Sequence, residues 1–128
     1  MNAAAAGKIY PDVQFTVEPY RVEAFRAVFA EVTGVPATFA TAAEFTVIPD
    51  VVADPELGLD FTRVLHGTQE YAFERPLEEG ERLTIRSKIE SIREMGGNGF
   101  LVLATELLDP EGAVVCTARS TLIERAAD

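Results

Sequence analysis

His66 and Glu44 are the residues of this sequence whose types and settings best suit catalysis. His66 is the only histidine, and a neutral imidazole can serve as a general base at neutral pH when a neighbouring acid orients it. Asp60 and Glu70 are close to it in sequence, but nothing in the sequence brings either carboxylate to the imidazole. The favoured interpretation is therefore a structural histidine, hydrogen-bonded at the start of a strand.

Glu44 is the only charged residue between Ala37 and Ile48. An acid in an apolar helix is either poised for proton transfer or, more commonly, paired at a gap or an interface. Cys116 has apolar neighbours on its own strand phase, which favours a small core residue over a nucleophile. With one histidine and no cluster of metal-ligand spacing, the sequence predicts no metal site and no resident cofactor.

Length, charge and cysteine content exclude several classes of protein. The 128 residues correspond to one domain, and the formal net charge of −10 repels phosphate backbones, so we expect no nucleic-acid partner. A single cysteine excludes an internal disulfide and fits a reducing compartment. Residues 1–8 lack the basic and apolar regions of a signal peptide, so we expect a cytoplasmic protein. We predict that these residues form a flexible terminus and that the domain spans 9–125.

The segment from Pro36 to Ile48 is the element that must position Glu44. It is apolar nearly all round and rich in small alanines, which is typical of a buried helix. Pro36 suits the first turn, and Pro49 is expected to end or kink the helix near Ile48. About twelve residues rise about 18 Å, too short to cross a membrane core of about 30 Å, so we expect protein and not lipid to bury the helix.

The other elements are one helix and several strands. Alternation over 9–17 predicts a first strand, and apolar spacing from Val22 to Val32 predicts an amphipathic surface helix that begins at Pro19 and ends near Gly34. Further strand-like runs, with turn residues between them, span 64–75, 83–92, 100–108 and 113–124.

Two of these runs carry further information. Ile92 breaks the phase that Leu83, Ile85 and Ile89 share, which predicts a bulge or an early departure from the sheet near Ser91. The run 100–108 is apolar on both phases in its first half, which predicts a central strand covered on both faces. A sheet of consecutive antiparallel strands curled around one central helix is the simplest way to bury that helix. The sequence therefore predicts an α+β protein with a single hotdog fold.

Several stretches also carry a family resemblance. Residues 64–80 read VLHGTQEYAFERPLEEG, the next stretch reads ERLTIRSKIESIRE, and the last strand follows DPEG and reads AVVCTARSTLIER. These stretches resemble the MaoC-like dehydratase family. The opening YPDVQFTVEPYRVEAFRAVFAEV and the PATF start of the central helix are similar to its N-terminal, fatty-acid-synthase-type branch. Within that branch the chain most resembles the non-catalytic, acyl-binding subunit of heterodimeric (R)-hydroxyacyl dehydratases and enoyl-CoA hydratases.

The catalytic motif of that family is the main departure. Active members carry Asp-x-Asn-Pro-(Ile/Val)-His just after the first helix, where Asp and His add or remove water at the α and β carbons of a thioester. Residues 31–44 of this sequence contain no Asp, Asn or His. The resemblance therefore implies binding of an acyl thioester, on coenzyme A or a carrier protein, by a chain that pairs with a catalytic hotdog chain. A heterodimer is favoured, with a homodimer as the alternative.

The resemblance also implies a place for the acyl group, in a tunnel between two chains along the central helix. Backbone N–H groups at the helix start would face the thioester carbonyl, where a helix N-terminus favours negative charge. The residues expected to contact the acyl thioester lie on this helix or at the start of the strand that follows: Thr38, Phe39, Ala40, Ala43, His66 and Gly67.

The sequence leaves two other functions open. One is a self-sufficient hotdog thioesterase or hydratase that uses Glu44 or His66, and the other is a plain acyl-thioester-binding module. A set of basic residues is either a patch for coenzyme A phosphates or, more simply, the charged outer face of a half-solvated sheet: Arg63, Arg75, Arg82, Arg86 and Lys88.

Overall fold

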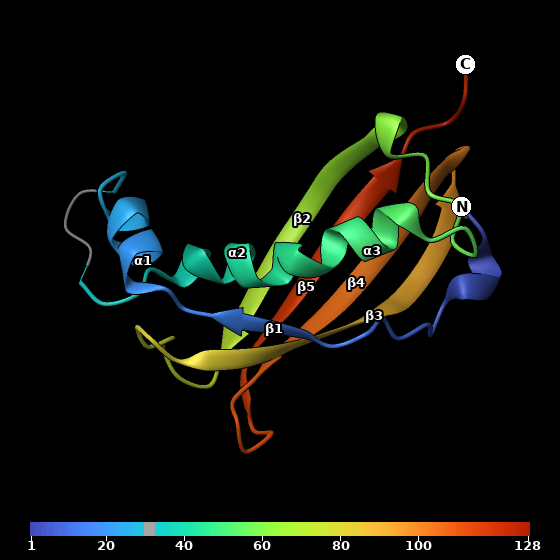
Figure 1. The fold of residues 1–128 in the computed structure, drawn as a ribbon. Coiled ribbons are helices and arrows are strands. Elements are labelled where there is room, and N and C mark those ends of the chain that lie inside the picture. Colours follow the sequence, from blue (N-terminus) through green and yellow to red (C-terminus); the bar gives the residue numbers. More distant parts are fainter. Residues whose placement is uncertain (30–32) are drawn as a thin grey trace.

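A five-stranded antiparallel sheet curls around a helical segment in the computed structural model, which describes residues 1–29 and 33–128 (Figure 1). The strands lie in the order β1-β3-β4-β5-β2, and their bounds are β1 Val13–Thr16, β2 Val64–Phe73, β3 Arg82–Met95, β4 Asn98–Leu108 and β5 Val114–Glu124. Every neighbouring pair is antiparallel. The predicted α+β class and single hotdog fold are confirmed.

The central helical segment (37–53) is made of four short pieces: 3₁₀ turns at Ala37–Phe39 and Phe45–Val47, and the helices α2 Ala40–Glu44 and α3 Ile48–Ala53. Pro49 lies in the first turn of α3, where its missing N–H needs no partner. The structure therefore shows an interruption just before Pro49, as one of the two expected effects of this residue. Of the two alternatives, an end or a kink near Ile48, the end does not occur, because the segment continues to Ala53.

Only one side of the central helical segment is buried. Phe39 and Ala43 are at most 2% exposed, whereas Phe45 is 45% exposed. The ring centroid of Phe45 lies 6.4 Å from that of His66 on β2, so the uncovered side adjoins β2. The prediction of a helix buried on all sides is wrong for the single chain, because one curled sheet covers only the side that faces it.

Helix α1 (Pro19–Arg26) is shorter than the apolar pattern that predicted it. Val22 is fully buried, which confirms an amphipathic helix at this position. Val28 and Phe29 are 77% and 46% exposed, so the apolar face does not extend beyond the helix as predicted. Val32, the last residue of the predicted pattern, lies outside the described residues. The helix lies beside the start of the central helical segment, at one end of the sheet (Figure 1).

Strand β4 is central, as predicted, but it is well covered on one face only. Leu101 and Leu103 point inward and are at most 2% exposed. Phe100, Val102 and Ala104 point to the outer face of the sheet and are half-buried. The prediction of two covered faces is wrong, because the central helical segment packs on the inner face and these apolar side chains lie on the opposite one.

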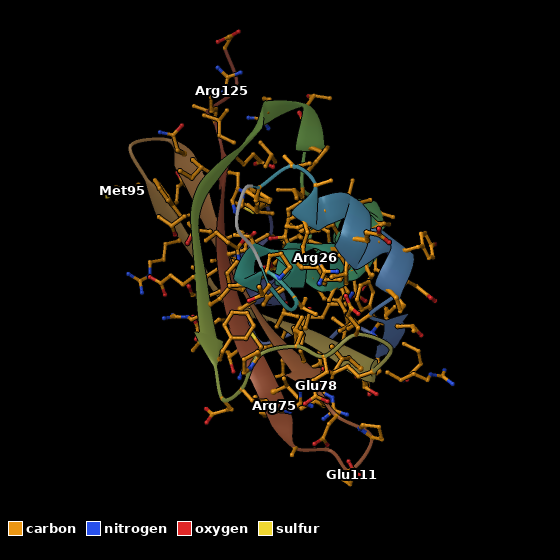
Figure 2. All side chains as sticks on the ribbon, turned by 90° about the vertical axis from the view of Figure 1, so that its left-hand side faces the viewer. Arg26, Arg75, Glu78, Met95, Glu111 and Arg125 are labelled. Carbon is orange, nitrogen blue, oxygen red and sulfur yellow. The ribbon has the colours of Figure 1, made fainter. Side chains whose placement is uncertain are left out.

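The predicted bulge and turns are confirmed. The register between β3 and β4 shifts between Ile89 and Ser91, and β3 remains in the sheet beyond the shift. Glycines 96 and 97 make the hairpin that follows, with φ of +60° and +78°, which side chains with a Cβ rarely adopt. Met95 at this hairpin and Glu111 at the β4–β5 turn mark opposite ends of the sheet (Figure 2).

Residues 1–8, which we predicted to be a flexible terminus, are hydrogen-bonded to the rest of the domain. The N–H of Gly7 donates to the carbonyl of Ile89 at 2.8 Å, and the N–H of Asn2 donates to the carbonyl of Leu57 at 2.8 Å. These bonds tie the segment to β3 and to the loop that follows α3.

Candidate functional site

A cluster of polar side chains lies where α2 passes the inner face of β2, at the edge of the sheet. Glu44 is the last residue of α2, and Thr41 lies three residues before it, on the same side of the helix. Gln69 and Tyr71 are two residues apart on β2, so both side chains point to the same face of the sheet. We call Thr41, Glu44, Gln69 and Tyr71 the α2–β2 cluster.

Hydrogen bonds in the α2–β2 cluster run from Thr41 through Tyr71 to Glu44. The Tyr71 hydroxyl donates to Glu44 Oε2 at 3.3 Å, and because this uses its only proton, the Thr41 hydroxyl donates to the Tyr71 oxygen. Glu44 Oε1 and both amide atoms of Gln69 are buried without a hydrogen-bond partner among the described residues. Such unsatisfied atoms are uncommon inside proteins, so the cluster is a candidate functional site.

Burial sets the protonation of this site. Loss of water raises the pKa of Glu44 above its ordinary 4.5, while the Gln69 amide and the Tyr71 hydroxyl oppose the rise. The Gln69 amide therefore lies near enough to lower the pKa of Glu44, although the two side chains do not meet the distance and angle limits of a hydrogen bond. Burial raises the pKa of Tyr71 to about 12, which keeps the phenol a neutral donor. Burial also raises the pKa of Cys116 to about 11, which agrees with a core residue and not a nucleophile.

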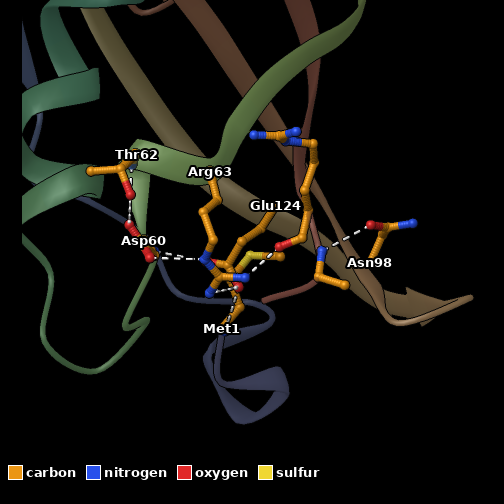
Figure 3. Close-up of polar contacts among 8 residues, drawn as sticks. Met1, Asp60, Thr62, Arg63, Asn98 and Glu124 are labelled. Atoms are coloured by element: carbon orange, nitrogen blue, oxygen red, sulfur yellow. Dashed lines mark hydrogen bonds and ion pairs between the residues drawn. The ribbon is translucent and has the colours of Figure 1, made fainter. Parts of the chain in front are cut away.

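His66 lies on β2 with an exposed side chain, and no acid orients it in the described part of the chain. Its Nε2 atom lies 3.1 Å from Oγ of the buried Ser120 on β5. The carboxylate of Asp60 instead accepts a hydrogen bond from Arg63 at 2.8 Å (Figure 3). Glu70 is exposed and lies on the outer face of β2. These contacts support a structural histidine.

Three residues predicted to line an acyl tunnel lie in the core: Phe39, Ala40 and Ala43. None is more than 2% exposed, and the ring of Phe39 packs against Phe15 and Phe25 with centroid separations of 6.2 and 5.5 Å. The helix turns these side chains toward the sheet, away from the uncovered side. An acyl chain would have to displace packed side chains to reach them, so their role as tunnel lining stays a prediction.

Thr38 and Gly67, also predicted to contact the substrate, are exposed but far apart. Thr38 lies at the start of the central helical segment, and Gly67 lies in a β2 bulge at a register shift between His66 and Thr68. Phe73 on β2 lines a hollow beside the start of the central helical segment. Gly67 lies six residues before Phe73, and six residues of strand span about 20 Å. The structure therefore does not bring Thr38 together with Gly67.

That hollow lies beside the start of the central helical segment and has a volume of about 410 Å³. Val35 and Ala37 form one wall, and Phe73 and Leu77 contribute to the other. Arg75 also lines it, but its guanidinium is held by Glu81 at 2.8 Å. Most of the lining is therefore apolar; its one cation is neutralised by an internal partner, and its one acid is Glu74.

Sequence reasoning missed Thr41, Gln69 and Ser120 as members of these contacts. A signal existed for Gln69, which shares the strand phase of Tyr71 and therefore its face. No local pattern indicated that Ser120 would meet His66, because the two lie on different strands and 54 residues apart.

The basic residues do not form an open patch. Three of the five pair with carboxylates: Arg63 with Asp60, Arg75 with Glu81 and Arg86 with Asp12. This favours the simpler interpretation of a charged outer surface. Within residues 1–29 and 33–128, no group of three or more His, Cys, Asp or Glu side chains is placed to hold a metal ion. None of the helices in these ranges combines the length and apolar character of a membrane span.

The sequence over residues 13–118 matches the family described as FAS1-like, dehydratase domain region. The chain belongs to this FAS1-like dehydratase family. A relative, a UPF0336 protein of Streptomyces avermitilis, is 45% identical over 93 residues, which cover 73% of this chain and 62% of the relative. The FAS1-like chain thus spans less than two thirds of that relative's length.

Two solved structures share the fold of this FAS1-like chain. The C-terminally truncated HadBC (3R-hydroxyacyl-ACP dehydratase) complex of Mycobacterium tuberculosis aligns with a TM-score of 0.80 and 24% identity, over 93% of this chain and 96% of that chain. A MaoC-like dehydratase aligns with a TM-score of 0.81 and 22% identity, over 98% of this chain and 43% of that chain. The family match confirms the predicted resemblance to a dehydratase family of the fatty-acid-synthase type, and these two structures show that the fold is that of MaoC-like dehydratases.

Proposed function

We propose that this chain is the acyl-thioester-binding subunit of an (R)-specific enoyl-CoA hydratase or 3-hydroxyacyl-thioester dehydratase, and that a second hotdog chain supplies the catalytic Asp and His. One observation carries the proposal. The chain keeps the family pattern over 13–118, yet residues 31–44 hold no Asp, Asn or His where the catalytic motif is expected. The family pattern is thereby retained, while the groups for water addition are missing from residues 31–44.

The free edge of β2 supports a partner chain. β2 pairs with β5 on one side, and no described strand lies on the other. Phe45, Phe61 and Leu65 on or near this edge are 45%, 52% and 53% exposed, and exposed apolar side chains beside an unpaired strand favour association. A second hotdog chain aligned along β2 would continue the sheet and cover them. The structurally similar HadBC protein is itself described as a complex.

Charge on β2 favours a different chain over a second copy. Glu70 and Glu74 are exposed on the outer side of this edge and have no ion-pair partner among the described residues. In a register centred near Ala72, antiparallel pairing of two identical edges puts Glu70 of each chain opposite Glu74 of the other, where like charges destabilise pairing. A partner strand without acids at these positions avoids that repulsion.

Two features on the β2 side of the central helical segment support a place for the thioester. The apolar hollow at the segment start suits the acyl group next to the thioester, and the uncovered side of the segment between α2 and β2 suits the acyl tail. The thioester is the substrate in this proposal, and no resident cofactor is needed.

Co-expression with a hotdog chain of the same genome that carries the family's Asp and His tests the proposal. We expect the two chains to co-purify at equal stoichiometry and to hydrate trans-2-enoyl-CoA thioesters, with activity lost when the partner's Asp or His is replaced. Purification as a homodimer that binds no such partner would contradict the proposal.

A second candidate function is a self-sufficient thioesterase or hydratase, for which the geometry favours Glu44 over His66. Glu44 is buried next to the neutral phenol of Tyr71, and burial raises the pKa of Glu44, which suits a general acid or base. His66 has no orienting acid among the described residues. If the chain alone shows turnover, the variant Glu44→Gln should abolish it and His66→Ala should not. Full activity in both variants excludes this function.

A further inference from the structure

We propose that Glu44 and Gln69 form a polar socket that selects acyl groups carrying a hydroxyl within the tail. The inference rests on the proposed acyl-thioester function and names the class of acyl group that this chain accepts. It is carried by three neighbouring polar atoms that are buried and unpaired: Glu44 Oε1, Gln69 Oε1 and Gln69 Nε2.

The unpaired atoms gather in one part of the inner sheet surface. Elsewhere under the central helical segment, Ser87 on β3 and Thr105 on β4 are each 1% exposed, and their hydroxyls bond to one another at 2.6 Å. Buried polar groups on the β3–β4 side thus satisfy each other, as is usual in protein cores. Only the β2 side, within the described residues, leaves buried side-chain atoms without partners.

The socket lies next to the uncovered side of the central helical segment. Tyr71, which bonds to Glu44, is half-buried, and Phe45, the residue after Glu44, is exposed. A ligand that follows this side of the segment would therefore pass Glu44 and Gln69. A plain hydrocarbon tail at this position would exclude water and leave all three polar atoms unpaired, which opposes its binding.

A hydroxyl group matches what the socket lacks. Its proton can be donated to Glu44 Oε1, and its oxygen can accept a hydrogen bond from Gln69 Nε2. These two hydrogen bonds replace the bonds that the hydroxyl makes with water when free, so its own desolvation is offset. Sites built to bond a hydroxyl discriminate strongly against analogues without one, because the protein's polar atoms are then left without hydrogen-bond partners.

Calorimetric titration of the purified chain, together with any partner that accompanies it, tests the socket. The probes are decanoyl-CoA and a series of hydroxydecanoyl-CoA thioesters in which the hydroxyl moves from beyond the reacting carbons to the terminal carbon. We expect at least one hydroxylated thioester to bind about tenfold or more tightly than decanoyl-CoA. The double variant Glu44→Leu/Gln69→Leu should lose this preference and bind decanoyl-CoA at least as tightly as the unmodified chain does.

A matched control is Ser87→Ala/Thr105→Val, which removes both members of a satisfied polar pair outside the socket and should keep the preference. Circular dichroism establishes that each variant is folded before titration. Equal affinity for all probes, or a preference that survives in the leucine variant, would overturn the inference while leaving acyl-thioester binding intact. Absence of binding by every probe would overturn both the inference and the proposed function.

Discussion

The two edges of the sheet differ in how completely this chain closes them. The β1 edge is a strand of only four residues, and β2 at the other edge has ten. A buried acid lies near each edge. Glu44, within the central helical segment, lies on the β2 side, and Asp54, the residue after the segment, lies on the β1 side. Comparing these acids shows which edge is complete in the single chain.

Asp54 has a partner for each carboxylate oxygen. The Tyr10 hydroxyl and Lys8 Nζ both lie 2.8 Å from Oδ2, and the N–H of Glu56 donates to Oδ1 at 2.9 Å. Glu44 has a single 3.3 Å bond to one oxygen and none to the other within the described residues. The buried acid on the β1 side is therefore satisfied by this chain's own residues, whereas the acid on the β2 side keeps one oxygen without a partner among the described residues.

The largest expected effect is on the free energy of unfolding when an aromatic of the β1 edge is removed. Phe15 is 5% exposed and packs against Phe39, so Phe15→Ala should destabilise the chain by about 3–5 kcal/mol. Leu65 on β2 is 53% exposed, and Leu65→Ala should cost less than about 1 kcal/mol in the single chain. Urea denaturation of both variants measures the difference. Similar losses at the two edges would remove the basis of the comparison.

Partner affinity should show the opposite dependence. The double variant Phe45→Asp/Leu65→Asp should weaken binding of the catalytic hotdog chain by about thirtyfold or more, because two exposed apolar contacts become charged. Met95 is 68% exposed at the β3–β4 hairpin, so Met95→Asp is a control that should leave affinity unchanged. Sedimentation velocity of the mixed chains gives both affinities. Loss of pairing in the Met95 variant alone would place the interface elsewhere.

The stability contributed by Glu44 should decrease as pH rises. Burial raises its pKa in the folded chain above the ordinary 4.5, so the folded state holds this proton more tightly than the unfolded state does. The wild type should therefore lose stability relative to Glu44→Gln as pH rises from about 4.5 to neutral. Thermal unfolding across this range measures the effect. A difference that is constant with pH would show that Glu44 is not held in an apolar setting.

Asp54 should show the reverse sign. Its hydrogen bonds with Lys8 and Tyr10 hold its pKa at about 2, below the ordinary 3.8, so its stabilisation is present above 3.8 and is lost as pH falls through about 2. Asp54→Asn should therefore be less stable than the wild type at neutral pH, and the two melting temperatures should converge in acid. Convergence at alkaline pH instead would contradict the assignment.

Much of the fold could be predicted because local sequence patterns indicate strands and turns. Alternation placed β1 and β2, and the glycines at 96 and 97 placed the β3–β4 hairpin. The end of α1 could not be predicted, because Val28 and Phe29 continue the apolar spacing after the helix has stopped. Apolar side chains on the outer face of β4 likewise look like core residues in a sequence.

The candidate site was predictable only in part. Glu44 stood out as a lone charge in an apolar helix, and its burial is confirmed. Which side chains meet it depends on how α2 crosses the sheet, and that packing is not contained in any local spacing. Gln69 is 25 residues away in sequence, and the burial of Phe39 and Ala43 in the core likewise depends on that packing.

The most direct test of the central claim follows enoyl absorbance while the purified chain is mixed with trans-2-enoyl-CoA thioesters, with calorimetry reporting binding of the same compounds. The account predicts binding without loss of absorbance until a hotdog chain that carries the family's Asp and His is added. Clear turnover by this chain alone, lost in Glu44→Gln, would contradict the account and establish the chain as an enzyme in its own right.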